Sequence, residues 1–193
     1  RSLGGSEMCI RDRLYFESIR LGTLTSDLKV VEPLMRDSDI VSMDMTAVKS
    51  NELQGGMTQV NGFTAQQFCA LARYVGISDR VRFVGLCNIP ESSASSNLTA
   101  QAVWYMVEGM HYRVNEYPFS TKQNSVRYVV SCDDQELIFY QSSLSKRWWL
   151  EVQPEDGSNL EAVLISWSEE DFYTAEKGTV AERWWKAIRR SVI

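Results

Sequence analysis

The stretch Asp39-Ile40-Val41-Ser42-Met43-Asp44-Met45 decides the predicted fold. It is a short apolar run with the length of a strand, and a carboxylate, Asp44, stands near its end. Parallel strands are buried on both faces, and the sites of α/β proteins lie at the carboxyl ends of such strands. We therefore interpret residues 39–45 as a central parallel strand with a candidate site at its end.

The residues around this strand predict an alternation of helices and strands. Thr64 is expected to cap the helix after the strand, and Gly76 to end it. Pro33 places the start of the preceding helix near Val31. The predicted elements are a helix ending at about Arg36, the central strand, a helix from Ala65 to about Val75, a strand from Val81 to Cys87 and a helix from Leu98 to about Val114. This order predicts an α/β fold with a parallel sheet.

The segment from Lys49 to Gly62 has the composition of a long loop. It contains Gly55, Gly56 and Asn61 and has almost no hydrophobic periodicity. Because it follows the central strand directly, we expect it to lie over the strand end and to line the site.

After Pro118 the pattern becomes that of a small α+β extension, residues 117–193. Two strand-like runs flank Cys132-Asp133-Asp134-Gln135, which has the composition of a hairpin turn. The predicted elements are strands at Val126–Ser131, Glu136–Tyr140 and Trp148–Val152, and closing helices at about Glu169–Lys177 and about Val180–Arg190.

Composition excludes several classes of protein. Of the 193 residues, 44% are hydrophobic and 23% charged, which is typical of a soluble globular protein. The net charge of -5 comes from dispersed acids and bases, so no nucleic-acid footprint is expected. The apolar runs are far shorter than the roughly 20 residues of a membrane helix. Four widely spaced cysteines without a CxxC pair favour a reducing cytoplasm, and Asn97-Leu98-Thr99 is then interpreted as a helix start rather than a glycan acceptor.

The first residues have a separate origin in our interpretation. The run Gly5-Ser6-Glu7-Met8-Cys9-Ile10-Arg11-Asp12 resembles the translation of a transposase sequencing adapter. Residues 1–13 are therefore left out of the fold prediction, and the natural protein is expected to extend further upstream.

Two segments carry a resemblance to a known family. Ser42-Met43-Asp44-Met45-Thr46-Ala47-Val48 followed by Asn61-Gly62-Phe63-Thr64 is similar to the arginase and agmatinase signature, and Phe83–Pro90 resembles the later strand of that family. Residues 14–193 further resemble a bacterial formimidoylglutamase-like subgroup. That likeness rests on Arg20-Leu21-Gly22, Glu32-Pro33-Leu34, Leu71–Gly76, Lys146-Arg147-Trp148-Trp149 and Glu182-Arg183-Trp184-Trp185.

The resemblance implies a fold for each part of the chain. Residues 14–116 would be the carboxyl-terminal half of a three-layer α/β/α ureohydrolase domain with a parallel sheet, and residues 117–193 its α+β extension. Members of the family often assemble as trimers or hexamers, so a homo-oligomer is also expected.

The resemblance implies a chemistry too. Active members use two manganese ions, whose bridging hydroxide attacks the carbon of a small-molecule amidine or guanidine. Asp44 matches one metal ligand of the family. Thr46 occupies the position of a second aspartate, and Asn88 occupies that of a glutamate that orients the substrate. Formimidoylglutamate is the substrate that the subgroup implies.

Two functions remain open at this stage. The first is metal-dependent hydrolysis of a linear amidine. The second, favoured by Thr46 and Asn88, is a non-catalytic relative that binds a partner or small molecule through the loop 49–62 or the tryptophan-rich tail. Asp44 could equally accept backbone hydrogen bonds from the adjoining loop.

Three other features have simpler interpretations than catalysis. His111 is expected to be a partly exposed helix residue rather than a metal ligand. Cys87 is expected to be a small buried strand residue rather than a nucleophile, since no histidine lies near it in the sequence. The paired Arg-Trp-Trp triplets are expected to pack the extension against the main sheet.

Overall fold

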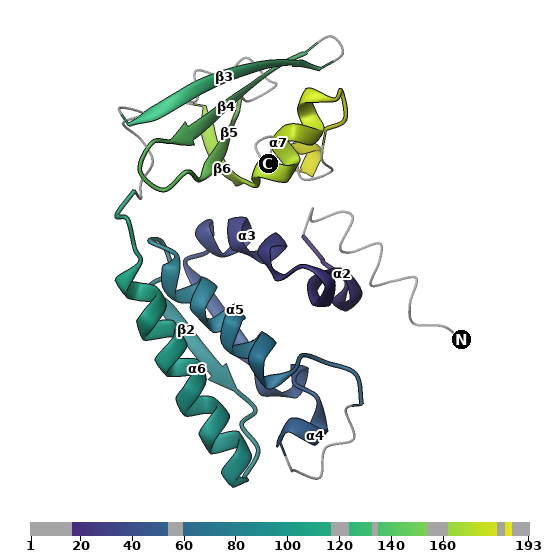
Figure 1. The fold of residues 1–193 in the computed structure, drawn as a ribbon, viewed down its shortest axis with the longest axis vertical. Coiled ribbons are helices and arrows are strands. Elements are labelled where there is room, and N and C mark those ends of the chain that lie inside the picture. The colour runs from purple at the N-terminus through teal and green to yellow at the C-terminus, as the bar shows by residue number, and fades with distance from the viewer. Residues whose placement is uncertain are drawn as a thin grey trace, which may run out of the picture. The chain divides into compact units, whose positions relative to one another are not determined.

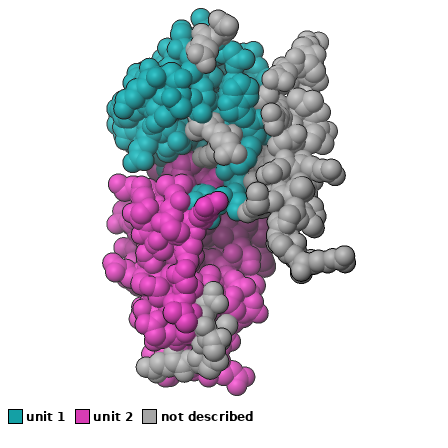
Figure 2. All heavy atoms as spheres, turned by 90° about the vertical axis from the view of Figure 1, so that its right-hand side faces the viewer, with its two compact units in different colours: residues 1–19, 121–193 teal, residues 20–120 magenta. Residues whose placement is uncertain are grey.

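The chain divides into two compact units. The computed structural model describes residues 17–53, 60–116, 124–132, 135–153, 162–180 and 184–186. One unit comprises residues 20–120, and the other comprises residues 1–19 and 121–193 (Figure 2). Each unit has a hydrophobic core of its own. Residues 1–13, which we interpreted as adapter sequence, lie outside the described residues.

The unit of residues 20–120 alternates helices and strands (Figure 1). Its elements are α2 (Leu21–Ser26), the 3-10 helix η1 (Leu28–Val31), α3 (Glu32–Arg36), β1 (Ile40–Asp44), the 3-10 helix η2 (Met45–Ala47), α4 (Ser50–Leu53), α5 (Ala65–Ile77), β2 (Phe83–Cys87) and α6 (Ser93–His111). Pro33 lies in the first turn of α3, where a proline costs no hydrogen bond. The predicted α/β alternation is therefore confirmed.

β1 and β2 form a parallel pair, as the sequence predicted. Ile40 lies opposite Phe83, and Asp44 lies opposite Cys87. Both strands therefore end at the same edge of the sheet. Within the described residues this sheet has two strands, so the mixed α/β class is established while the three-layer arginase-type sheet is not.

The two faces of this sheet differ in burial. Val41 and Met43 are buried in a core shared with residues of α5 and α6. The alternate residues of the strands point to the opposite face of the sheet. On that face Ile40 is 70% exposed and Phe83 is 62% exposed. The described residues of this unit therefore cover one face of the sheet.

The first turn of α5 follows the prediction, and its last turn does not. Thr64 and Gln67 form a reciprocal capping box at the start of the helix. Gly76 was predicted to end α5, but the helix continues through Ile77. A Cβ at Gly76 would overlap the Met106 carbonyl of α6. This glycine thus permits close approach of two helices instead of terminating one.

α6 begins earlier than predicted. Ser92 is its N-cap and accepts a hydrogen bond from the backbone N–H of Ser95 at 3.0 Å. Asn97, which we interpreted as part of the helix start, lies inside the second turn. Ser92 rather than Asn97 is the N-cap, because the Ser92 hydroxyl accepts a hydrogen bond from a backbone N–H of the first turn.

The second unit is an antiparallel meander followed by a helix (Figure 1). Its elements are β3 (Ser125–Cys132), β4 (Gln135–Ser142), β5 (Trp148–Val152), β6 (Val163–Trp167) and α7 (Glu169–Glu176). The predicted hairpin and third strand are confirmed, whereas β6 was not predicted. Ser168 caps α7 through the Asp171 N–H at 3.0 Å. The turn residues 133–134 and most of the predicted last helix lie outside the described residues.

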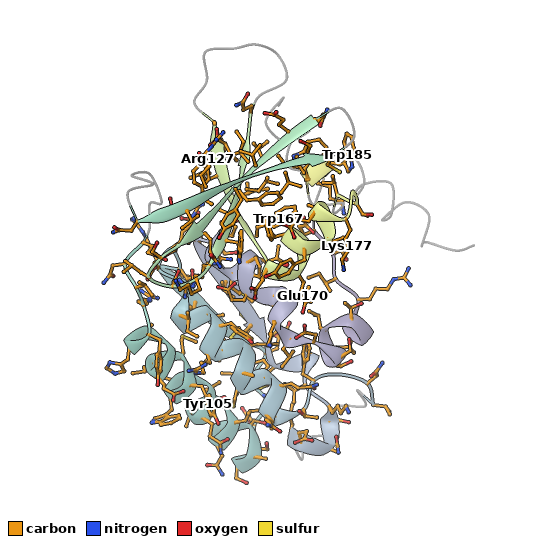
Figure 3. All side chains as sticks on the ribbon, turned by 45° about the horizontal axis from the view of Figure 1, so that its top comes forward. Tyr105, Arg127, Trp167, Glu170, Lys177 and Trp185 are labelled. Carbon is orange, nitrogen blue, oxygen red and sulfur yellow. The ribbon has the colours of Figure 1, made fainter. Side chains whose placement is uncertain are left out.

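Aromatic side chains fill the core of this second unit. The rings of Trp148 and Phe172 stack with centroids 4.1 Å apart. Trp167 is 1% exposed and lies in the same core, on β6 directly before α7 (Figure 3). Trp184 is buried there as well. Trp148 and Trp184 therefore pack within the core of the extension itself.

The length and hydrophobicity of the described helices can be compared with those of a membrane-spanning helix. In the described part of the chain, none is both long enough and apolar enough to cross a bilayer.

Candidate functional site

The parallel register of β1 and β2 brings the candidate residues together. Asp44 ends β1 beside Cys87, the last residue of β2. Asn88 follows immediately, and its side chain points to Asp44: the Asn88 amide Nδ2 donates a 2.8 Å hydrogen bond to Asp44 Oδ2. Two positions 44 residues apart in sequence are thus joined at one sheet edge, where the sequence predicted a site.

The other carboxylate oxygen of Asp44 is held by Thr46. Asp44 Oδ1 accepts from the backbone N–H of Thr46 at 2.8 Å and from its hydroxyl Oγ1 at 2.7 Å. Asp44 is the N-cap of η2, so the first of these is a capping bond. Both oxygens of the carboxylate therefore have protein donors, and Thr46, predicted only as a lost ligand position, is a donor to Asp44.

These hydrogen bonds stabilise the ionised form of Asp44. The Thr46 hydroxyl, the Thr46 backbone N–H and the Asn88 amide, in that order, hold the pKa of the Asp44 carboxyl below its ordinary value of 3.8. Partial desolvation opposes this shift. Asp44 is therefore a carboxylate at neutral pH without any need for a metal ion.

The backbone at Asn88 explains the residue type. Its φ of 52° lies in the left-handed region, which asparagine adopts more readily than most non-glycine residues. A glutamate there would be strained and would place a second negative charge beside Asp44. Asparagine tolerates this backbone conformation, and its side-chain amide also donates a hydrogen bond to Asp44.

A cysteine and a serine lie next to the site on the exposed face of the sheet. Ser42 Oγ and Cys87 Sγ are 3.5 Å apart, and Cys87 is an exposed free thiol. No group of three or more His, Cys, Asp or Glu side chains suited to a metal ion occurs among the described residues. Cys87 was expected to be a small buried strand residue. It is the last residue of β2, but it is exposed, because it lies on the face of the sheet that the described residues leave open.

His111 lies far from these residues. It is exposed and is the last residue of α6, a helix of 19 residues that begins shortly after Asn88. At 1.5 Å per residue the helix is about 28 Å long. His111 therefore lies at the end of α6 that is remote from Asn88, and it ends the helix instead of lying in its middle.

Two backbone hydrogen bonds close the base of the predicted loop 49–62. Phe63 N–H donates to the Ala47 carbonyl at 2.8 Å, and Lys49 N–H donates to the Phe63 carbonyl at 2.9 Å. A Cβ at Gly62 would overlap Ala47, so the crossing requires a glycine. Residues 54–59 of the predicted loop lie outside the described residues. The base of the predicted loop thus lies directly after the Asp44–Thr46 turn.

The beginning of the loop is joined to α6. Ser92 Oγ donates to the Leu53 carbonyl at 2.6 Å, so the N-cap of α6 also holds the end of α4. The sequence did not predict this double role of Ser92. Its only signal in the sequence is the serine-rich run 92–96.

Comparisons with known proteins add no relative. The sequence matches no protein-family model, and searches of curated proteins and of solved structures found no match.

Proposed function

We propose that this chain is a non-catalytic relative of the arginase-type hydrolases, which keeps part of their three-layer fold and serves as a binding or structural protein. The observation that carries the proposal is the hydrogen bonding of Asp44. Its two oxygens accept three hydrogen bonds from Thr46 and Asn88, the residues at the positions where the resemblance implies acids. These hydrogen bonds connect the carboxyl ends of β1 and β2.

The chemistry of the donors does not fit a pair of manganese ions. Hard divalent cations need several carboxylate oxygens and imidazoles, because each ligand must replace tightly held water. Here one carboxylate, one hydroxyl and one amide meet at the strand ends. The amide directs N–H donors toward Asp44, and a donor cannot ligate a cation.

The loop base is the part of this site best suited to binding. Residues 60–63 and 47–49 form a closed frame at the carboxyl ends of the strands, where α/β proteins bind ligands. The tryptophan-rich tail is less suited, because Trp148 and Trp184 are buried in their own core. A reducing cytoplasmic setting belongs to the proposal and is supported by the free thiols of Cys69, Cys87 and Cys132.

Amidine hydrolysis is the competing function. The ionised Asp44 at the end of a parallel strand is what a metal ligand of such an enzyme requires. Activity with manganese would then depend on ligands from other parts of a longer polypeptide.

An activity assay separates these functions. The protein is purified with added manganese, its metal content is measured, and it is incubated with formimidoylglutamate, agmatine and arginine. We expect no stoichiometric metal and no hydrolysis above the rate of a heat-treated sample. Stoichiometric manganese together with hydrolysis that Asp44→Ala abolishes would overturn the proposal.

A further inference from the structure

Strand β3 is an open edge of the four-stranded sheet. The strands lie in the order β3-β4-β5-β6, so β3 has a described partner strand on one side only. Figure 1 shows it at the margin of the meander. β3 is eight residues long and pairs with β4 along its whole length, from Ser125 opposite Ser142 to Cys132 opposite Gln135. The edge of a sheet presents backbone donors and acceptors to which a further strand can bond.

The hydrogen bonds between β3 and β4 establish which residues face the open side. The Ser143 N–H donates to the Asn124 carbonyl at 2.7 Å, so Asn124 and every second residue after it bond to β4. The residues between them direct their N–H and C=O groups to the open side, and these include Arg127, Val129 and Ser131. All three residues are exposed. We call Arg127, Val129 and Ser131 the β3 edge.

β3 lacks the features by which proteins usually protect a sheet edge. Those features are a short strand, proline, a β-bulge or several charged residues. Residues 125–132 contain no proline and a single charge, and their register with β4 runs without a bulge. The opposite edge strand, β6, has five residues and is followed directly by the N-cap of α7. The β3 edge is therefore the side of this sheet where an extended peptide can add as a further strand.

The side chains along the β3 edge define the chemistry of its partner. Arg127 is the only charged residue of β3, and among the described residues it has no ion-pair partner. Val129 lies two residues further on the same face and is 47% exposed. Lys146 adds positive charge near the start of β3, since its N–H bonds to the carbonyl of Ser142, which lies opposite Ser125. An incoming strand should therefore place a carboxylate beside Arg127 and an apolar side chain beside Val129.

We propose that the β3 edge binds an extended segment of another protein, in which an acidic residue follows an apolar residue at a spacing of two. The segment adds antiparallel to β3, its backbone bonds to the outward N–H and C=O groups, and its carboxylate pairs with Arg127. A second copy of β3 does not supply this partner, because residues 125–132 contain no acidic residue. The β3 edge belongs to a different unit from Asp44, so the inference does not depend on the function proposed above.

Peptide binding to the full chain, measured by fluorescence anisotropy, tests this inference. The probe is a labelled, capped peptide of about seven residues, the usual length of a strand. It consists of threonine except for one valine and, two positions later, one glutamate. In an antiparallel pair the glutamate then lies beside Arg127 when the valine lies beside Val129. A second peptide has lysine in place of the glutamate.

Three variants separate charge from backbone pairing. Arg127→Glu reverses the charge of the edge. Lys177→Glu is the matched control, because it makes the same change in net charge at the exposed C-cap of α7, and Figure 3 labels both positions. Val129→Pro removes an outward N–H and leaves the hydrogen bonds to β4 in place, as prolines in edge strands do. Circular dichroism and thermal unfolding establish that each variant is folded.

We expect the wild type and Lys177→Glu to bind the glutamate peptide with a Kd of about 10–100 µM, about fivefold more tightly than the lysine peptide. Arg127→Glu should reverse this preference, and folded Val129→Pro should bind both peptides more weakly. Wild-type protein that binds neither peptide up to about 1 mM would overturn the proposal. An unchanged preference of Arg127→Glu for the glutamate peptide would overturn it as well.

Hydrogen exchange locates the bound peptide on the chain. In the free protein the amides of Arg127, Val129 and Ser131 should exchange rapidly, because their N–H groups face the open side. Saturation with the glutamate peptide should slow their exchange by about tenfold. Amides that are already protected in the free chain would show that the edge is covered and would rule out the proposal. Binding that leaves these three amides unprotected would rule it out too.

Discussion

The side-chain amide of Asn88 donates to Asp44 Oδ2 at 2.8 Å and so connects the carboxyl end of β2 to that of β1. Thr46 completes the arrangement from the other side by donating twice to Asp44 Oδ1. Each member of this group of three can be changed separately, and each change has its own expected result.

Removal of the Thr46 hydroxyl should destabilise the unit. Thr46→Val keeps the shape of the side chain but loses the 2.7 Å hydrogen bond to Asp44, whereas Thr46→Ser keeps the hydroxyl. We expect Thr46→Val to lower the Tm by about 2–4 °C and Thr46→Ser to stay close to the wild type. Thermal unfolding at pH 7 measures both. Equal Tm values for the two variants would mean that the hydroxyl contributes nothing.

The contribution of Asp44 should depend on pH. Its pKa is lowered in the folded protein, so the unfolded chain binds a proton more readily. The resulting stability is present above the ordinary value of 3.8 and is lost as the pH falls through the lower folded pKa. The difference in Tm between wild type and Asp44→Asn should therefore be largest near neutral pH and shrink below about pH 4.

Asp39 provides the control for this pH series. Two hydrogen bonds from Arg80, at 3.0 and 2.7 Å, also lower the pKa of Asp39. An Asp39→Asn background removes that contribution and should leave the pH-dependent effect of Asp44→Asn unchanged. If the effect disappears in this background, it did not originate at Asp44.

Asn88 should tolerate loss of its amide better than a new charge. Asn88→Gly removes the hydrogen bond to Asp44 but suits the φ of 52°, whereas Asn88→Asp also places a second carboxylate beside Asp44. At pH 7 we expect Asn88→Asp to have the lower Tm of the two variants, and the gap to narrow below about pH 4, where one carboxylate is protonated. A gap that does not respond to pH would contradict this electrostatic explanation.

The contact between α5 and α6 should be sensitive to single methyl groups. A Cβ at Gly76 would overlap the Met106 carbonyl, so Gly76→Ala forces the helices apart and should cost about 1–3 kcal/mol. Gly22 in α2 has nothing within 4 Å of an added Cβ, so Gly22→Ala is the control and should be neutral or slightly stabilising. Urea unfolding of both variants measures this, and a neutral Gly76→Ala would contradict the close approach.

Much of the fold could be predicted from short patterns of residues. The apolar run that ends in Asp44 predicted β1, and the Thr64 cap with its helical periodicity predicted the start of α5. These features are local, because each depends on residues within one or two turns. The pairing of β1 with β2 could also be inferred from the helix between them.

Features that depend on tertiary contacts could not be predicted. Gly76 has the appearance of a helix stop in the sequence, and only the proximity of Met106 explains its place within α5. β6 follows a polar stretch and was not recognised as a strand, although pairing with β5 makes it one. The sequence identified Asp44, Thr46 and Asn88 by position but did not reveal that they bond to one another.

The most direct test of the central claim is thermal unfolding of the wild type and Asp44→Ala in 1 mM manganese and in EDTA. A cation that binds the folded state raises its stability in proportion to the logarithm of its concentration over Kd, about 4 kcal/mol at 1,000 times Kd. If the hydrogen bonds of Thr46 and Asn88 satisfy Asp44, the wild-type Tm will be the same in both solutions, and Asp44→Ala will lower it equally in each. A manganese-dependent rise of several degrees that Asp44→Ala abolishes would contradict this account.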